Sequence, residues 1–231
     1  AREPEISQMC RFLNNMGAVI CGMGTDHLMV QGVAGLHDSS FRVEGDRIVA
    51  GTYGAAVVAA GGEALLRGIC PSDLKVPLEE FQKAGAAVDA DEKNRQIRIC
   101  MGKRPLPLLI KTEPYPGFPT DLQSPFMAFL ATAQGTSYIE EQVFEGRFAT
   151  AKILEQMGAV IRTEDQRAVI EGHYPLKGAV VNACDLRGGA ALMVAALAAE
   201  GDTFIGECHH IERGYRSEER RVGKECRSRW S

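Results

Sequence analysis

The chain has 231 residues, 45% of them hydrophobic, and its 26 Lys+Arg against 30 Asp+Glu give a formal net charge of -4. A chain of this length can bury a large core without disulfides or metals, as one large domain or two small ones. The mildly acidic charge argues against a nucleic-acid partner, and no apolar stretch approaches the roughly 20 residues that a membrane span needs. The seven cysteines contain no CxxC pair, which predicts reduced thiols and a cytoplasmic location.

The first predicted element is a helix within residues 3–17, EPEISQMCRFLNNMG, with Pro4 in its first turn. The chain begins at Ala1, without a start Met, and enters this helix at once. We therefore expect the chain to be a piece of a longer protein.

Internal repeats then organise the chain. Three segments each read as a helix end, a glycine turn and two short alternating strands, and their equivalent glycines are Gly17, Gly85 and Gly158. A second set of segments interleaves with the first, each an Ala-rich helix that leads past Gly62, Gly135 or Gly201 into a strand. One unit is thus strand, helix, strand, helix, strand, strand over about 70 residues. A few such units around a shared helical core predict a compact domain with sheets outside.

The repeats also divide the chain. Residues 1–45 are predicted to be the end of a preceding domain, and residues 46–215 to hold two units and the first half of a third. Residues 216–231, RSEERRVGKECRSRWS, differ abruptly in composition and resemble a translated sequencing-library adapter, so we expect a non-native tail. The alternative for this tail is a basic helix that touches nucleic acid or membrane, which its lack of an apolar stripe disfavours.

Charged residues recur at equivalent places in the units. Each predicted helix of the second set is preceded by an aspartate. These are Asp46, Asp121 and Asp185, which lie 16, 14 and 16 residues before Gly62, Gly135 and Gly201. Arg147 and Arg213 each lie in the predicted loop after the next strand, 12 residues after Gly135 and Gly201. An aspartate before a helix is by itself most often an N-cap, and a single arginine most often a surface side chain. The repetition, with Arg187 two residues after Asp185, instead favours a site for an anionic substrate, because guanidinium groups bind phosphate and carboxylate and a carboxylate can act as a base.

Three weaker candidates are set aside. Gly22 to Gly24, GMG, is predicted to lie in a hairpin turn and not in a nucleotide-binding loop. His209 and His210 have no third ligand at a suitable spacing, so no metal site is predicted. Cys184 is expected to be a buried structural thiol and not a nucleophile.

Four motifs carry a resemblance to a known family: GFPTDLQSPF, FEGRFATAKILEQMGA, DLRGGAALMVAALAAEG and HHIERGY. In order and spacing they resemble the second half of the UDP-N-acetylglucosamine 1-carboxyvinyltransferase family of enolpyruvyl transferases, over residues 1–215. The resemblance implies an α/β (α+β) fold in which repeated βαβαββ units surround a pseudo-threefold axis, an inside-out α/β barrel. It also implies transfer of the enolpyruvyl group of phosphoenolpyruvate to the 3'-hydroxyl of UDP-N-acetylglucosamine, a step of peptidoglycan synthesis.

The same resemblance implies roles for six residues. Asp121 matches the carboxylate that contacts the sugar 3'-hydroxyl and serves as general base, and Asp185 matches a second carboxylate near the reacting carbons. Arg147, Arg187 and Arg213 match cationic residues around the phosphoenolpyruvate and intermediate anions. The sixth, Val143, matches a position that contacts the uridine-sugar ligand.

No metal and no cofactor are implied, and the family's reactive cysteine corresponds to none of the seven present. The fragment itself is therefore expected to turn over substrate poorly or not at all. Two alternatives stay open: a 3-phosphoshikimate 1-carboxyvinyltransferase, or a non-catalytic ligand-binding fragment. Neither nucleic acid nor membrane is an expected partner.

Overall fold

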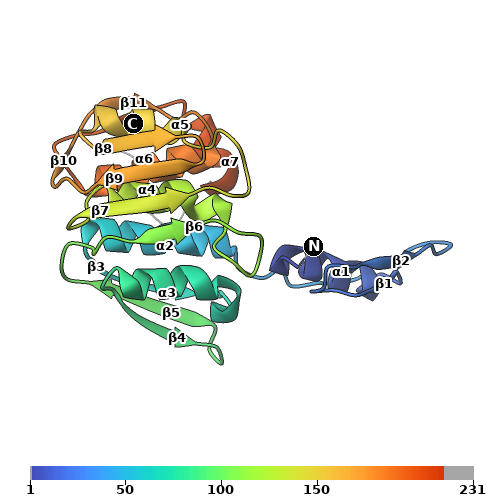
Figure 1. The fold of residues 1–231 in the computed structure, drawn as a ribbon. Helices are drawn as coiled ribbons and strands as arrows, with labels where there is room; N and C mark the ends of the chain where they lie inside the picture. The colour runs from blue at the N-terminus through green and yellow to red at the C-terminus, as the bar shows by residue number, and fades with distance from the viewer. Residues whose placement is uncertain (1, 216–231) are drawn as a thin grey trace.

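The computed structural model describes residues 2–215, and the predicted adapter-like tail lies outside the described residues. Figure 1 shows two parts: an extended N-terminal segment, residues 2–45, and a compact body, residues 46–215. A stretch without helix or strand, residues 32–46, joins them.

The N-terminal segment contains one helix and one hairpin. Helix α1 spans Pro4–Asn15 with proline in its first turn, as predicted. Gly17, at a φ of 97°, ends the helix turn and leads into β1 (Val19–Cys21), which pairs antiparallel with β2 (Met29–Gln31). Gly22 and Gly24 lie in the turn between these strands, which confirms that the GMG motif belongs to a hairpin.

The body begins with a unit of two helices and three strands. Its elements in chain order are α2 (Arg47–Ala60), β3 (Gly62–Arg67), a 3-10 turn (Pro71–Leu74), α3 (Lys75–Lys83), β4 (Ala87–Asp91) and β5 (Gln96–Met101). The strands form an antiparallel sheet in the order β3-β5-β4. No strand precedes α2 among residues 32–46, so the predicted first strand of this unit is absent. That stretch instead forms the connection to the N-terminal segment.

The second unit has all six predicted elements. They are β6 (Leu109–Lys111), α4 (Gln123–Leu130) after the 3-10 turn η2 (Thr120–Leu122), β7 (Thr136–Glu140), α5 (Ala149–Gln156), β8 (Val160–Glu164) and β9 (Arg167–Glu171). The sheet order is β6-β7-β9-β8, with β6 parallel to β7 and the other pairs antiparallel. Strands β7, β9 and β8 thus repeat the arrangement of β3, β5 and β4.

The third unit has the predicted first half and an added helix. Its elements are β10 (Leu176–Lys177), β11 (Val180–Asn182), α6 (Leu186–Leu197), β12 (Ala199–Glu200), β13 (Phe204–Gly206) and α7 (His209–Tyr215). Strand β11 runs parallel to β13, as β6 does to β7. The repeat predicted from the sequence is therefore confirmed at the level of strand pairing.

Helices α2, α4 and α6 form the centre of the body and pack against one another, with the sheets outside (Figure 1). Small residues let these helices approach closely. A Cβ added to Gly54 of α2 would lie 2.5 Å from the ring of Phe81, and one added to Gly51 would lie 2.5 Å from Leu122. Phe81, Phe126 and Phe129 are fully buried in this core.

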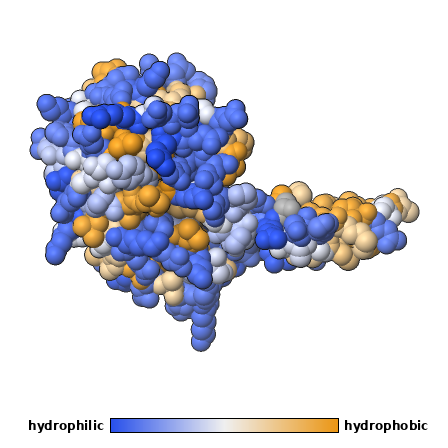
Figure 2. Space-filling model, viewed as in Figure 1, coloured by the Kyte–Doolittle hydropathy of each residue, from blue (hydrophilic) through white to orange (hydrophobic). Residues whose placement is uncertain are grey.

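The surface differs between the two parts. Figure 2 shows apolar side chains gathered over the N-terminal segment, while much of the visible face of the body is hydrophilic. Met29 and Val30 of β2 are 62% and 67% exposed. Within residues 2–215, none of the helices combines the length and apolar character that a bilayer-spanning helix requires.

Candidate functional site

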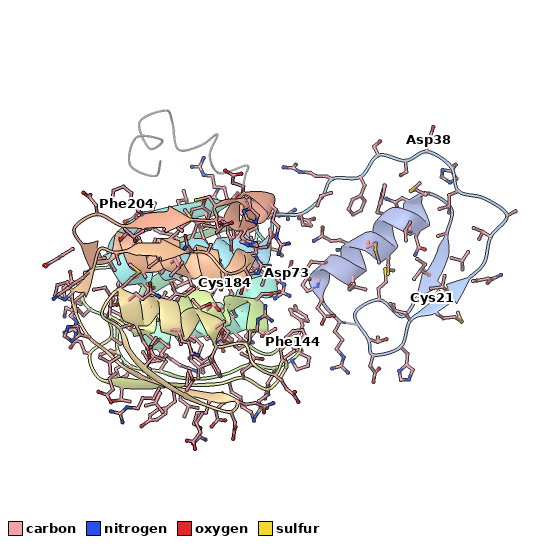
Figure 3. All side chains as sticks on the ribbon, turned by 90° about the horizontal axis from the view of Figure 1, so that it is seen from above. Cys21, Asp38, Asp73, Phe144, Cys184 and Phe204 are labelled. Atoms are coloured by element: carbon pink, nitrogen blue, oxygen red, sulfur yellow. The ribbon has the colours of Figure 1, made fainter. Side chains whose placement is uncertain are left out.

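The three recurring aspartates all precede central helices, as the repeats predicted. Asp46 is the N-cap of α2, Asp185 is the N-cap of α6, and Asp121 lies in η2 directly before α4. The starts of α4 and α6 lie together, because Oδ1 of Asp121 is 3.4 Å from Nε of Arg187, and Thr52 of α2 reaches Arg187 through Tyr215. In Figure 3, Asp73, Phe144 and Cys184 lie at the end that faces the N-terminal segment, and Phe204 lies at the opposite end.

Two of these aspartates cap their helices. The Asp46 Oδ1 atom accepts hydrogen bonds from the backbone N–H groups of Ile48 (2.7 Å) and Val49 (3.1 Å). The Asp185 Oδ1 atom accepts one from the backbone N–H of Gly188 at 2.7 Å. The capping interpretation is therefore confirmed for Asp46 and Asp185, and each bond satisfies a helix-terminal N–H that has no partner in the helix.

Asp121 differs because it lies inside η2 and is not an N-cap residue, a position that Pro119 takes in η2 and Leu122 in α4. Its Oδ1 atom instead accepts a hydrogen bond from Nη2 of Arg147 at 2.8 Å and lies 3.4 Å from Nε of Arg187. Arg147 comes from the loop after β7, and Arg187 from the first turn of α6. Three of the predicted site residues, from three separate segments, are thus in direct contact.

The charge of this cluster suits an anion. One carboxylate faces two guanidinium groups, so the cluster holds one positive charge beyond neutrality. The Asp121 side chain is 41% exposed and those of Arg147 and Arg187 are 25% and 19% exposed, so a ligand can reach all three. Partly buried guanidinium groups interact with phosphate or carboxylate more strongly than fully solvated ones do.

Arg187 is held by residues that sequence reasoning missed. Its Nη1 atom donates to the hydroxyl of Tyr215 at 3.5 Å, and that hydroxyl lies 2.9 Å from Oγ1 of Thr52. Tyr215 belongs to α7, and Thr52 to α2. The only sequence signal for Tyr215 was its place in the HHIERGY motif. The contact joins the first and third units beside the cluster.

Arg147 is also held by neighbours. Its Nη1 atom donates to Oγ1 of Thr120 at 2.9 Å, and its guanidinium carbon lies 5.0 Å from the ring centroid of Phe144. Oγ1 of Thr120 in turn donates to Oε2 of Glu141 at 2.9 Å. Glu141 was not predicted, yet a signal existed, because the alternation of Ser137, Ile139 and Glu141 places all three side chains on the buried side.

Among the described residues, Asp185, Arg213 and Val143 make no hydrogen bond or ion pair with Asp121. Within residues 2–215, the ion pairs of Asp121 are those with Arg147 and Arg187. Arg213 has an exposed side chain and lies in helix α7, so its predicted place in a loop was wrong. Val143 lies in the loop between β7 and α5, and its backbone N–H donates to Oε1 of Glu141 at 2.9 Å.

Cys184 is exposed, so the prediction of a buried thiol was wrong. Its pKa is raised, first by partial desolvation and then by the neighbouring Asp185 carboxylate, whose Oδ2 atom lies 3.4 Å from the sulfur. A raised pKa leaves less thiolate at neutral pH, which argues against a nucleophilic role.

A third group does join the histidine pair. Ligand atoms of Glu207, His209 and His210 lie within 4.8 Å of one another, and Nδ1 of His209 is 3.3 Å from Oε2 of Glu207. The expectation that no third ligand lies near these histidines was therefore wrong. The cluster sits at the start of α7, beside β13.

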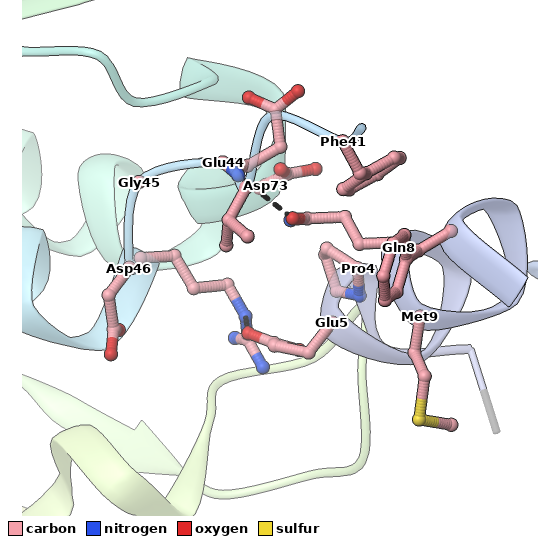
Figure 4. A pocket seen from close by; sticks show the side chains of 12 residues that line it. Pro4, Glu5, Gln8, Met9, Phe41, Glu44, Gly45, Asp46 and Asp73 are labelled. Carbon is pink, nitrogen blue, oxygen red and sulfur yellow. Dashed lines mark hydrogen bonds and ion pairs between the residues drawn. The ribbon is translucent and has the colours of Figure 1, made fainter. Parts of the chain in front are cut away.

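A cavity of about 350 Å³ lies between α1 and the start of the body (Figure 4). Across it, Nε of Arg47 donates to Oε1 of Glu5 at 2.7 Å, and the backbone N–H of Glu44 donates to Oε1 of Gln8 at 3.0 Å. Its lining does not include Asp121 or its arginine partners. The cavity therefore belongs to the junction of the two parts.

Residues 1–220 match the family model described as EPSP synthase (3-phosphoshikimate 1-carboxyvinyltransferase). The chain belongs to this family. A relative named UDP-N-acetylglucosamine 1-carboxyvinyltransferase from Hyphomonas neptunium is 43% identical over 96% of the chain and 53% of its own length. One of the same name from Brucella ovis is 43% identical over 97% of the chain and 52% of its own length. The chain spans about half the length of these curated relatives.

Solved structures agree on the fold. The crystal structure of the enolpyruvyl transferase NikO from Streptomyces tendae matches 94% of the chain and 52% of its own chain, with a TM-score of 0.81 and 27% identity. An EPSP synthase structure from Acinetobacter baumannii matches 77% of the chain and 43% of its own chain, with a TM-score of 0.56 and 21% identity, which bears on the fold alone. The predicted enolpyruvyl-transferase fold is confirmed.

Proposed function

We propose that this chain forms part of a UDP-N-acetylglucosamine 1-carboxyvinyltransferase. The observation that carries the proposal is the contact of one Asp121 oxygen with two guanidinium groups, in a chain 43% identical to proteins of that name. The substrates proposed are UDP-N-acetylglucosamine and phosphoenolpyruvate. Phosphoenolpyruvate carries a carboxylate and a phosphate, and the two arginines supply the matching positive charge.

The proposed reaction is an addition followed by an elimination. The sugar 3'-oxygen bonds to C2 of phosphoenolpyruvate while C3 gains a proton. C3 then loses a proton, the bond from C2 to the phosphate oxygen breaks, and inorganic phosphate leaves. The product is an enolpyruvyl ether. Each step changes the charge near the carboxylate and phosphate groups, so the fixed guanidinium charge stabilises the transition states.

The residues take the following proposed roles. Asp121 accepts the proton of the 3'-hydroxyl, since bound substrate anions compete with it for Arg147 and Arg187. Oδ1 of Asp185 caps α6, while Oδ2, which accepts a weak hydrogen bond from the Cys184 thiol, lies beside the reacting carbons. Arg213 adds a third cation, and Val143 contacts the uridine-sugar ligand. We propose no metal and no cofactor.

The organisation of the whole protein is part of the proposal. Residues 1–45 are proposed to be the last part of a first domain and residues 46–215 most of a second. Catalysis is proposed to take place between the two domains, in a cytoplasmic enzyme. By itself the chain would turn over substrate poorly or not at all. Exposed apolar residues of the N-terminal segment, such as Met29 and Val30, support a further covering part.

The test joins the first half of the Hyphomonas neptunium relative to this chain and measures phosphate release from phosphoenolpyruvate. We expect release that requires UDP-N-acetylglucosamine from the joined protein, and little or none from the 231-residue chain. If the joined protein folds and binds UDP-N-acetylglucosamine yet releases no phosphate, the proposal is wrong.

The second candidate is a 3-phosphoshikimate 1-carboxyvinyltransferase, which the description of the matching family model favours. The same assay decides between them, because this enzyme would release phosphate with shikimate 3-phosphate and not with UDP-N-acetylglucosamine. The relatives at 43% identity make UDP-N-acetylglucosamine the better supported acceptor.

A further inference from the structure

Glu141 is a fully buried carboxylate at the end of β7 that the proposed chemistry does not use. Four donors surround its two oxygens. Oε1 accepts from Oγ1 of Thr112 (2.8 Å) and from the backbone N–H groups of Val143 (2.9 Å) and Phe144 (3.1 Å). Oε2 accepts from Oγ1 of Thr120 at 2.9 Å. A carboxylate is an acceptor only, so this set of donors matches it fully.

These bonds fix the loop that carries Arg147. Glu141 holds the N–H groups of residues 143 and 144, and Oγ1 of Thr112 accepts the N–H of Gln142 at 2.8 Å. Three consecutive backbone groups of the loop are therefore anchored to two buried side chains. Arg147 follows three residues later in the same loop, and its side chain extends to Asp121.

The same carboxylate sets the donor direction of Thr120. A hydroxyl has one proton, and in Thr120 that proton goes to Oε2 of Glu141. The hydroxyl oxygen is then free to accept from Nη1 of Arg147, which it does at 2.9 Å. The Nη2 atom of the same guanidinium reaches Asp121 at 2.8 Å. Both outer nitrogens of Arg147 are thus held, and the plane of the guanidinium is fixed.

We propose that Glu141, acting through Thr120, is the positioning residue that fixes the Arg147 guanidinium for anion binding. The inference rests on the proposed function for the role of Arg147 as an anion ligand. Glu141 itself, fully buried, does not touch substrate. Its effect is to keep a planar donor in one orientation, which lowers the cost of ordering that donor when the anion arrives.

The first test does not depend on activity. In the 231-residue chain, ¹⁵N relaxation of the Arg147 Nε–H group reports side-chain order, with Arg147→Lys identifying the signal. We expect Thr120→Val and Glu141→Gln to raise the mobility of this group, and Thr120→Ser to preserve its order. The matched control is Thr132→Val at the other end of α4, which removes a buried hydroxyl that donates to the Phe129 carbonyl at 2.7 Å. Unchanged order in a folded Thr120→Val protein contradicts the inference.

The second test uses the joined protein described above. Thr120→Val is expected to lower kcat/KM for phosphoenolpyruvate about tenfold, as loss of a hydrogen bond to a charged group does. KM for UDP-N-acetylglucosamine should stay within about twofold, and Thr120→Ser should restore activity. An equal loss for both substrates, or an equal loss in Thr132→Val, would indicate a merely structural role.

The two tests separate the two ideas. If the joined wild-type protein shows no turnover, the proposed function fails, while the relaxation measurement still decides whether Glu141 and Thr120 order Arg147. If turnover is present and the Thr120→Val protein is both ordered at Arg147 and fully active, the positioning role fails and the proposed function stands.

Discussion

The N-terminal segment and the body bury their apolar residues to very different degrees. In residues 2–45 the buried apolar side chains are Cys10 and Ile20, whereas Met29 and Val43 are 62% and 78% exposed. In the body, three phenylalanines and many aliphatic residues are fully buried in one cluster. We infer that the body has a core of its own, while the N-terminal segment has an apolar face suited to contact with another part of a protein.

The largest expected effect that tests this contrast is on core stability. Phe126 stacks with Phe81 at a centroid distance of 4.8 Å and contacts Phe118 and Phe129. Phe126→Ala should therefore lower the free energy of unfolding by about 3–5 kcal/mol, because it leaves a cavity in a packed interior. Met29→Ala in the segment should change it by less than about 0.5 kcal/mol. Urea denaturation followed by circular dichroism measures both, and similar losses would remove the contrast.

A smaller effect is expected at the junction. Arg47, with a side chain only 10% exposed, pairs with Glu5 at 2.7 Å, and its guanidinium lies 5.4 Å from the ring centroid of Tyr115. Glu5→Gln should weaken the attachment of α1 by about 1 kcal/mol or less, since Glu5 is half exposed. Hydrogen exchange should then speed up in α1 and stay unchanged in α4. Faster exchange in both helices would mean that segment and body unfold as one unit.

The smallest effect is a pH dependence at the same junction. Asp73 lines the cavity at the junction (Figure 4). Burial raises the pKa of Asp73 above its ordinary value of 3.8, and Arg47 partly opposes this shift. As the pH rises from 3.8, the unfolded chain therefore loses this proton before the folded one does, and stability falls until the folded group has also ionised. Asp73→Asn removes this fall, so the variant should be more stable than wild type at pH 7 and equal to it below pH 3.8.

Thermal unfolding across that pH range measures the difference. Asp89→Asn, a change on the exposed strand β4, is the control and should leave the curve unchanged. A wild-type advantage at pH 7 over the Asp73 variant would show that Asp73 stabilises the junction through its charge.

Much of this fold was readable from the sequence because each unit repeats its own local signals. Gly85 and Gly158 have φ values of 100° and 86°, as a glycine after a helix end requires, and Asp121, Arg147 and Arg187 meet because equivalent helix starts meet. The sequence predicted a strand before α2 that the structure does not have. Strand formation depends on a pairing partner and not on residue pattern alone.

The residues that hold the site arginines could not be predicted from the sequence for a related reason. Glu141 and Thr120 are linked through space by a hydrogen bond between residues 21 positions apart, and Thr52 and Tyr215 by one between residues 163 positions apart. Neither pair leaves a spacing signature. Glu207, by contrast, lies only two residues before His209, so this contact could have been read from the sequence.

We propose that Asp121, held between Arg147 and Arg187, acts on the substrate hydroxyl. Its most direct test is kcat for phosphate release by the joined protein carrying Asp121→Asn, which keeps the shape of the side chain and removes its basic oxygen. We predict a fall of about 10²–10⁴-fold, with phosphoenolpyruvate and UDP-N-acetylglucosamine still bound, and no change in the control Asp89→Asn. A folded Asp121→Asn protein that keeps wild-type kcat would show that Asp121 is not the base.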